Sequence, residues 1–171
     1  NLADRETICI ITNMDEPLGF AVGNILEVKE AIEFLRGNMP SDLKSVVLEL
    51  GSYMIKLAGL GENIEENKLK LLENISYLEN LNKFKKAKYI EPIFANKTGY
   101  IYKINAENVG KLSCYLGAGR IKKDDQIQSD VGIVLNKKVG DYVSENEILA
   151  YIHSNDSNKL EHAKLELSNI I

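Results

Sequence analysis

The spacing of apolar residues along this chain changes near its middle, from a helical period to a strand-like one. Residues 7–12 form an apolar, β-branched run without polar alternation, which predicts a strand buried on both faces in a parallel or mixed sheet. From Ile25 to about residue 79, apolar residues recur every three or four positions, as in helices that bury one face. A strand followed by helices indicates an α/β domain.

Three helices are predicted in this first half. The first carries one apolar stripe made of Ile25, Val28, Ile32 and Leu35. Asn24 stands at its N-cap position, and Gly37 follows its last turn, where glycine often ends a helix. The second helix begins near residues 40–42 and ends at the glycine break of residues 59–61, and Asn63 is placed to cap the third.

The second half consists mainly of predicted short strands. β-Branched and aromatic residues gather in four runs separated by turn residues, at 89–95, 100–104, 131–135 and 148–152. A helix is expected at residues 106–115, and a last helix carries Leu160, Ala163, Leu167 and Ile170 on one face. We therefore predict an α/β (α+β) fold. Residues 1–86 form part of a mixed-sheet α/β domain, and residues 87–171 form a small β-rich, barrel-sandwich-like module with helices.

Composition and charge narrow the class of protein. The chain has 171 residues, of which 44% are hydrophobic and 27% charged, the balance of a globular protein in water. No apolar run approaches the roughly 18 to 20 residues that span a bilayer, and no basic and apolar leader opens the chain. We therefore expect a cytoplasmic protein without membrane contact. A net charge of −4 favours no nucleic-acid partner, and we interpret the lysine cluster of residues 83–88 as a solvated linker.

The start of the chain and its cysteines give two further expectations. The chain opens without an initiator methionine, and its first element is a buried-type strand with almost nothing before it to pair with. We expect it to be the carboxyl-terminal part of a longer protein. Cys9 and Cys114 lie far apart in apolar segments, which is typical of reduced, packed thiols rather than a disulfide.

A glycine-aspartate turn at residues 138–143, followed by the apolar run 148–152, resembles the hairpin of biotinyl and lipoyl carrier domains. In such carriers the modified lysine stands at the tip of the next hairpin. Here that stretch is residues 153–156, which contains no lysine. The resemblance therefore supports a barrel-like fold more than a carrier function. A non-catalytic binding or interaction module remains the alternative function.

Two other groups of residues are weaker site candidates. His153 and His162 have no cysteine, histidine or carboxylate partners at the spacing of a structural zinc site, so we interpret them as ordinary histidines. The loop of residues 117–120, Gly-Ala-Gly-Arg, has amides and an arginine that suit an anion. Because it follows a helix instead of opening one, a turn with a surface arginine is favoured.

The acidic residues of the first predicted helix are stronger candidates. Glu27, Glu30 and Glu33 lie off the apolar stripe, which is typical of a solvated face. Glu30, however, has Leu26 four residues before it and Phe34 four residues after it, so its face is partly apolar. A covered carboxylate needs a cation or hydrogen-bond donors, and the preceding loop offers carbonyl oxygens. This combination of oxygens suits a hard cation.

Longer segments, taken in order, resemble one enzyme family. Residues 11–24 with 26–31, then 116–120, and then 131–141 together resemble the signature of the thymidine/pyrimidine-nucleoside phosphorylases. The Pro-Leu-Gly of residues 17–19 and the run 131–141 are more similar to the broad-specificity bacterial pyrimidine enzyme. The resemblance implies phosphorolysis of a pyrimidine nucleoside, with phosphate as co-substrate and (deoxy)ribose 1-phosphate as product. It also implies a homodimer for the complete enzyme.

The resemblance implies a partial site in this chain. The family's glycine-rich phosphate loop and its Arg, Ser and Lys set for the base do not occur in these residues, so we assign no catalytic or substrate-binding residue here. The family also binds a potassium-like monovalent cation, and the matching positions are Leu18, Ala21 and Glu30. The first two would contribute main-chain oxygens and Glu30 a carboxylate. The connection at residues 84–88 is shorter than the family's usual one.

Overall fold

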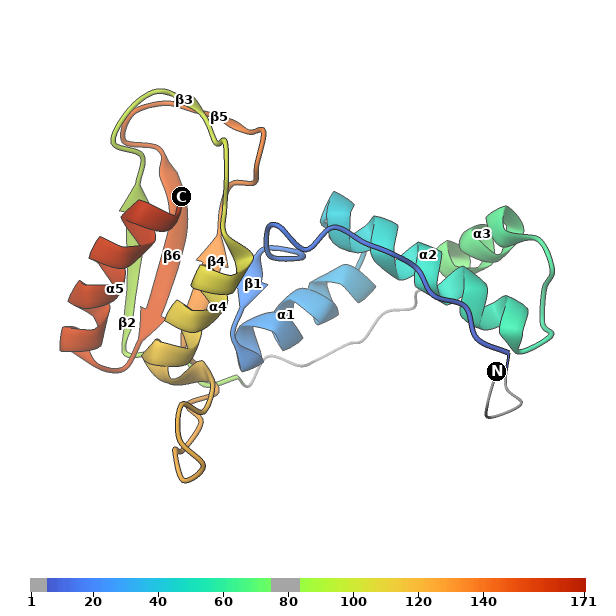
Figure 1. The fold of residues 1–171 in the computed structure, drawn as a ribbon, viewed down its shortest axis with the longest axis horizontal. Coiled ribbons are helices and arrows are strands. Elements are labelled where there is room, and N and C mark those ends of the chain that lie inside the picture. The colour runs from blue at the N-terminus through green and yellow to red at the C-terminus, as the bar shows by residue number, and fades with distance from the viewer. Residues whose placement is uncertain (1–5, 75–83) are drawn as a thin grey trace. The chain divides into compact units, whose positions relative to one another are not determined.

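The computed structural model describes residues 6–74 and 84–171, and these form two compact units (Figure 1). The first unit contains residues 1–13 and 32–79, and the second contains residues 14–31 and 80–171. The helical pattern beyond residue 74 and Lys83 lie outside the described residues. The predicted domain boundary at residue 86 stays a prediction, since a compact unit is not by itself a domain of a longer protein.

The first unit is helical where it is described. Helix α1 (Asn24–Leu35) ends in it, and α2 (Ser41–Leu57) packs against α3 (Ile64–Asn74). Gly37 has a φ of 99°, as expected for a glycine beyond a helix end. The Asn63 side-chain oxygen accepts the N–H groups of Glu65 (3.0 Å) and Glu66 (3.2 Å). The predicted end of α1 and the predicted start of α3 are therefore confirmed.

The strand predicted at residues 7–12 is wrong. These residues adopt no regular secondary structure, and the side chain of Ile11 is 99% exposed. A strand needs the edge of another strand for its N–H and C=O groups, and the described residues of the first unit contain only helices and loops. The apolar face of α2 is also largely exposed, with Met54 at 69%.

The second unit is built on a four-stranded antiparallel sheet. Its strand order is β1 (Ala21–Val22), β4 (Gly132–Leu135), β6 (Ile148–Ser154) and β2 (Tyr89–Phe94). A two-stranded ribbon, β3 (Gly99–Tyr100) with β5 (Tyr142–Val143), extends from one end (Figure 1). Strands β2, β4 and β6 match the predicted runs. Of the run predicted at 100–104, only Tyr100 lies in a strand, β3. The short strands β1 and β5 were not predicted.

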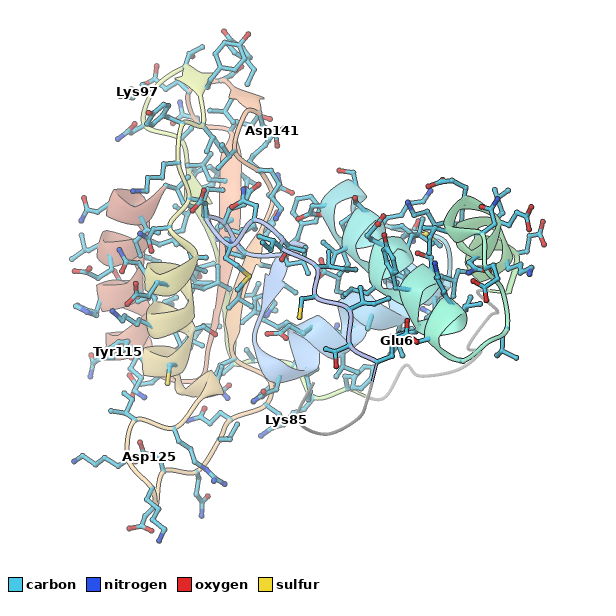
Figure 2. All side chains as sticks on the ribbon, turned by 45° about the vertical axis from the view of Figure 1, so that its right-hand side comes forward. Glu6, Lys85, Lys97, Tyr115, Asp125 and Asp141 are labelled. Atoms are coloured by element: carbon cyan, nitrogen blue, oxygen red, sulfur yellow. The ribbon has the colours of Figure 1, made fainter. Side chains whose placement is uncertain are left out.

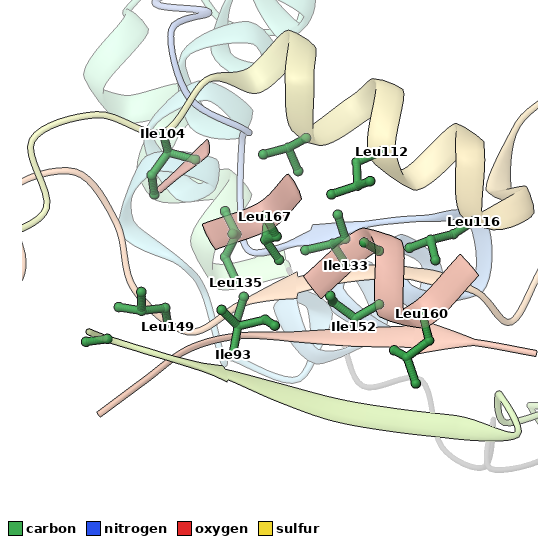
Figure 3. Packing of buried hydrophobic residues seen from close by; sticks show 14 of the residues in the cluster. Ile93, Ile104, Leu112, Leu116, Ile133, Leu135, Leu149, Ile152, Leu160 and Leu167 are labelled. Carbon is green, nitrogen blue, oxygen red and sulfur yellow. The ribbon is translucent and has the colours of Figure 1, made fainter. Parts of the chain in front are cut away.

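Two helices cover one face of this sheet, and the main hydrophobic core lies between the helices and the sheet (Figure 3). Helix α4 (Ala106–Ser113) continues as a π-helical turn, η1 (Cys114–Ala118), and α5 (Ser157–Ile170) closes the unit. Leu160, Ala163 and Leu167 of α5 are buried, as their spacing predicts. Ile133 and Ile152, paired across β4 and β6, are fully buried beneath the helices. Helices with an antiparallel sheet confirm the mixed α/β (α+β) class.

Candidate functional site

The loop that leads into α1 is fixed to the β-rich part of the second unit. The Asp15 carbonyl accepts the Ala106 N–H (3.1 Å) at the start of α4. The Phe20 carbonyl accepts the Leu135 N–H (2.7 Å) at the end of β4. We name residues 15–21 the hinge loop. Strand β1, which begins at the last residue of this loop, pairs with β4 at the edge of the sheet.

Glu30 reaches back from α1 to the hinge loop. Its Oε1 atom accepts the N–H of Phe20 (2.7 Å), and its Oε2 atom lies 3.4 Å from the N atom of Ala21. Gly19, with a φ of 68°, lies flat against the carboxylate, because a Cβ atom there would come within 2.4 Å of Oε2. A carboxylate has about four lone-pair positions. Glu30 therefore binds backbone amides of the hinge loop.

The buried face of α1 matches the predicted stripe only in part, since Ile32 of the stripe is 6% exposed. Leu26 and Phe34, four residues to either side of Glu30, are each 5% exposed, whereas Val28 of the stripe is 48% exposed. The partly apolar face that carries Glu30 is thus covered as well. Asn24 is the first residue of α1, and its side-chain amide donates to the Ala118 carbonyl (2.9 Å). Glu27 takes the capping role by accepting the Gly23 N–H (2.9 Å).

Of the three positions predicted to bind a cation, Ala21 and Glu30 are in contact. The Phe20 carbonyl points toward β4. Along a strand, the backbone N–H and C=O groups of successive residues point to opposite sides. The Ala21 carbonyl therefore points away from β4. The Ala21 N–H, beside Glu30, lies on that same side. Leu18 precedes Gly19 in the loop and its side chain is 48% exposed. Main-chain and carboxylate oxygens of this kind are ligands of hard cations.

No cluster of three or more His, Cys, Asp or Glu side chains suited to a metal occurs in the described residues. A transition-metal centre built from such side chains therefore has no support in this part of the chain. A site that takes most of its ligands from main-chain oxygens is not covered by that observation. The assignment of Leu18, Ala21 and Glu30 stays a prediction.

The Gly-Ala-Gly-Arg loop has the contacts of a structural turn. Gly117 has a φ of 117°, and its carbonyl accepts the Gln128 N–H (2.9 Å). Gly119 packs against the Cys114 sulfur, where a Cβ atom would come within 2.7 Å. The Asp125 carboxylate closes the next turn by accepting the N–H groups of residues 121 and 122 (3.0 and 2.8 Å), at the end of the unit opposite Lys97 (Figure 2). Arg120 is exposed, so the geometry favours the turn over an anion cradle.

The two histidines are in different surroundings. His153 lies half-buried in β6, and burial together with the positive charge of Lys29 lowers its pKa from the usual 6.5. His162 is exposed on α5, with its ring centroid 4.9 Å from that of Tyr115. Neither belongs to a metal cluster in the described parts of the chain. Both cysteines are free thiols as predicted, although Cys9 is exposed instead of packed.

The carrier-like segment has no hairpin tip. Strand β6 ends at Ser154, and the Asp156 carboxylate then accepts the N–H groups of Asn158 (2.8 Å) and Lys159 (3.1 Å) as the N-cap of α5. The position where carriers hold their modified lysine is therefore occupied by a helix start. This geometry gives a swinging-arm function no support.

Sequence reasoning missed that Lys138 and Val139 contact the hinge loop. Glu16 accepts the Val139 N–H (3.0 Å), and the Lys138 ammonium donates to the Pro17 carbonyl. Each pair is separated by more than a hundred residues, so no local period connects them. The only signal in the sequence was that residues 131–141 belong to the family-like segments, which marked the region without assigning a role to Lys138.

Comparisons with known proteins agree with the sequence resemblance. Residues 100–171 match the family model described as the pyrimidine nucleoside phosphorylase C-terminal domain. Proteins named pyrimidine-nucleoside phosphorylase from Staphylococcus aureus strains USA300 and NCTC 8325 are each 42% identical to this chain over 175 residues. The alignments cover 91% of the chain, and the chain spans 40% of the length of these relatives. The resemblance recognised from the sequence is thereby confirmed.

None of the helices in the described residues is both long enough and apolar enough to cross a membrane.

Proposed function

We propose that this chain, a relative of the pyrimidine-nucleoside phosphorylases over 91% of its length, forms the carboxyl-terminal part of such an enzyme. The observation that carries the proposal is the 42% identity that runs through both the hinge-loop half and the β-rich half. The complete protein would cleave pyrimidine nucleosides with phosphate in nucleoside salvage or catabolism. It would act in the cytoplasm as a homodimer.

The proposed reaction defines what this chain lacks. A phosphate oxygen forms a bond to the anomeric carbon while the bond from that carbon to the pyrimidine nitrogen breaks, and the base departs with the electron pair and takes a proton. Cationic and hydroxyl donors must hold the phosphate and stabilise the departing base. The glycine-rich Lys/Ser/Thr loop that supplies such donors in the family is absent from these 171 residues. We therefore expect the chain alone to be inactive.

Within the complete enzyme, the hinge loop would form part of a site for a potassium-like cation. The main-chain oxygens of Leu18 and Ala21 and the carboxylate of Glu30 would be ligands, with further oxygens from the rest of the protein. Support comes from the Glu30 carboxylate, which already lies against Gly19 and within hydrogen-bond distance of Phe20. In addition, the Pro17 carbonyl of the same loop accepts a hydrogen bond from the charged Lys138 ammonium.

A turnover assay tests the function. The complete protein that contains this chain should release free base from uridine or thymidine only when phosphate is present, and residues 1–171 alone should release none. Phosphate-dependent cleavage by the 171-residue chain would contradict the assignment of the reacting groups to another segment. A complete protein without phosphorolysis of either nucleoside would contradict the enzyme itself and favour the non-catalytic module.

The cation site has its own test in the complete enzyme. Glu30→Gln should raise the potassium concentration needed for half-maximal activity, because a neutral amide offers one carbonyl oxygen in place of a charged carboxylate. The matched control is Glu33→Gln on the same helix, since Glu33 pairs with Arg36 and Asn38 away from the hinge loop. Potassium dependence that is the same in both variants and the unmodified enzyme removes Glu30 from the site.

A further inference from the structure

We propose that Lys138 is a positioning residue that holds the hinge loop in the conformation required by the cation site. This inference rests on the proposed function, because it assigns a role within that site. The lysine lies 121 residues from the carbonyl that it contacts, in the turn between β4 and β5. None of the cation ligands assigned above comes from this turn.

The contacts of Lys138 are directed at the hinge loop. Its ammonium donates to the Pro17 carbonyl and lies 5.4 Å from the centroid of the Phe20 ring, a cation–π distance. Pro17 is buried and Lys138 half-buried, so this hydrogen bond is shielded from water. A charge-assisted bond of this kind is about twice as strong as a neutral one.

The backbone around Lys138 adds to the same attachment. The Leu135 N–H donates to the Phe20 carbonyl (2.7 Å), and the Val139 N–H donates to the Glu16 carboxylate (3.0 Å). The Lys138 N–H is itself held by the Asp141 carboxylate (2.7 Å), which closes the turn and fixes where the side chain starts. The segment 135–139 thus contacts the hinge loop at three successive places.

The neighbouring lysine provides an internal comparison. Lys137 forms an ion pair with Glu147 in the turn before β6, whereas Lys138 contacts the hinge loop. The two adjacent lysines have the same charge and nearly the same place in the chain. A variant of Lys137 therefore reports the loss of one positive charge from this turn without loss of the Pro17 contact.

The position of Pro17 explains how Lys138 acts on the cation ligands. Pro17 directly precedes Leu18, so holding the Pro17 carbonyl fixes the peptide plane from which the Leu18 residue and its oxygen continue. Ligands that are already arranged bind a cation more tightly than ligands that must be ordered first. The charge of Lys138 itself repels a cation, so positioning and repulsion predict opposite changes when the charge is removed.

The experiment compares Lys138→Met, Lys138→Arg and the control Lys137→Met in the complete protein that contains this chain. Amide hydrogen exchange at Phe20 and Ala21 reports the hinge loop without any need for activity. The potassium concentration for half-maximal activity reports the site. In Lys138→Met we expect exchange at both amides and the half-maximal potassium concentration each to rise about tenfold, the effect of losing one hydrogen bond to a charged group. In Lys138→Arg, amide exchange and the half-maximal potassium concentration should stay close to those of the unmodified protein. In Lys137→Met, neither quantity should change.

The outcomes separate this proposal from the function on which it rests. Unchanged exchange at Phe20 and Ala21 in Lys138→Met overturns it, and so does tighter potassium binding, which would show repulsion to be the dominant effect. An unmodified enzyme whose phosphorolysis ignores potassium overturns the cation site first, whatever the variants do. Equal effects of Lys137→Met and Lys138→Met overturn the specific role of Lys138.

Discussion

Gly19 and Glu30 show how closely two residues constrain each other in this chain. The glycine has a positive φ of 68°, and its missing side chain leaves the space that the Glu30 carboxylate fills. Any side chain at position 19 meets both a strained backbone and a charged group. The pair fixes the hinge loop against α1 independently of any bound ion.

We expect Gly19→Ala to lower the free energy of unfolding by about 2 kcal/mol or more, since conformational strain and displacement of Glu30 add. Urea unfolding of the 171-residue chain measures it. Gly140→Ala is the control, because Gly140 also has a positive φ (93°) but nothing lies within 4 Å of its added Cβ. Its cost should be about 1 kcal/mol. Equal losses of unfolding free energy at positions 19 and 140 would show that the Glu30 carboxylate moves aside without cost.

His153 should make stability depend on pH. Burial and Lys29 lower its pKa in the folded protein below the usual 6.5, so the unfolded chain binds the proton more readily. The stabilisation is fully present above pH 6.5 and is lost as pH falls from there through the folded-state value. His153→Gln should flatten this part of the curve of unfolding free energy against pH, measured by urea titration at several pH values. His162→Gln should leave the slope in place.

At the scale of elements, the contact between β1 and β4 is the closest backbone approach that glycines permit in this unit. An added Cβ at Gly132 would come within 2.3 Å of the Val22 carbonyl, and one at Gly23 within 2.5 Å of the Val131 carbonyl. Both glycines have positive φ values (145° and 151°). The hinge loop therefore depends on two glycines, far apart in sequence, for its attachment to the sheet.

Gly132→Ala should separate β1 from β4 and lower the free energy of unfolding by about 2 to 4 kcal/mol, because a backbone atom cannot move aside as a flexible side chain does. Hydrogen exchange should also rise at Leu135, whose N–H donates to Phe20. The control is Gly99→Ala, where an added Cβ meets nothing within 4 Å and no positive φ is involved. A Gly132→Ala chain as stable as the control would contradict this account.

At the scale of the whole molecule, the second compact unit is discontinuous in sequence. Residues 14–31 contribute β1 and most of α1 to it, and residues 80–171 contribute the rest. Residue contacts across that gap include the Ile25 N–H to the Ser129 carbonyl (2.9 Å) and the Ser113 hydroxyl to the Val22 carbonyl (2.8 Å). The β-rich module predicted at residues 87–171 thus shares its sheet with the hinge loop.

A fragment of residues 87–171 should be less stable than one of residues 14–171. Without β1, the outer edge of β4 loses its ladder partner and exposes unpaired N–H and C=O groups. We expect a lower urea midpoint and faster exchange along β4 in the shorter fragment. Equal midpoints for the two fragments would show that residues 14–31 add nothing to the stability of the module.

Local sequence signals predicted the helices and most of the larger strands. The glycine after α1, the Asn63 cap of α3 and the buried face of α5 depend on residues a few positions apart, so a linear pattern contains them. The pattern at residues 7–12 failed for the opposite reason. Apolarity indicates that a segment prefers burial, but a strand also needs a pairing edge elsewhere in the chain.

The sequence by itself determined the class of fold, the end of α1, the start of α3, and the resemblance to an enzyme family, because these depend on local periods and on ordered motifs. Tertiary structure alone decided that Val28 is exposed, that Glu30 binds the amides of Phe20 and Ala21, and that Lys138 contacts Pro17. The physical reason is the sequence separation over which each interaction acts. Caps and periods act within a few residues, whereas hydrogen bonds across 121 residues form only after the chain has closed around its core.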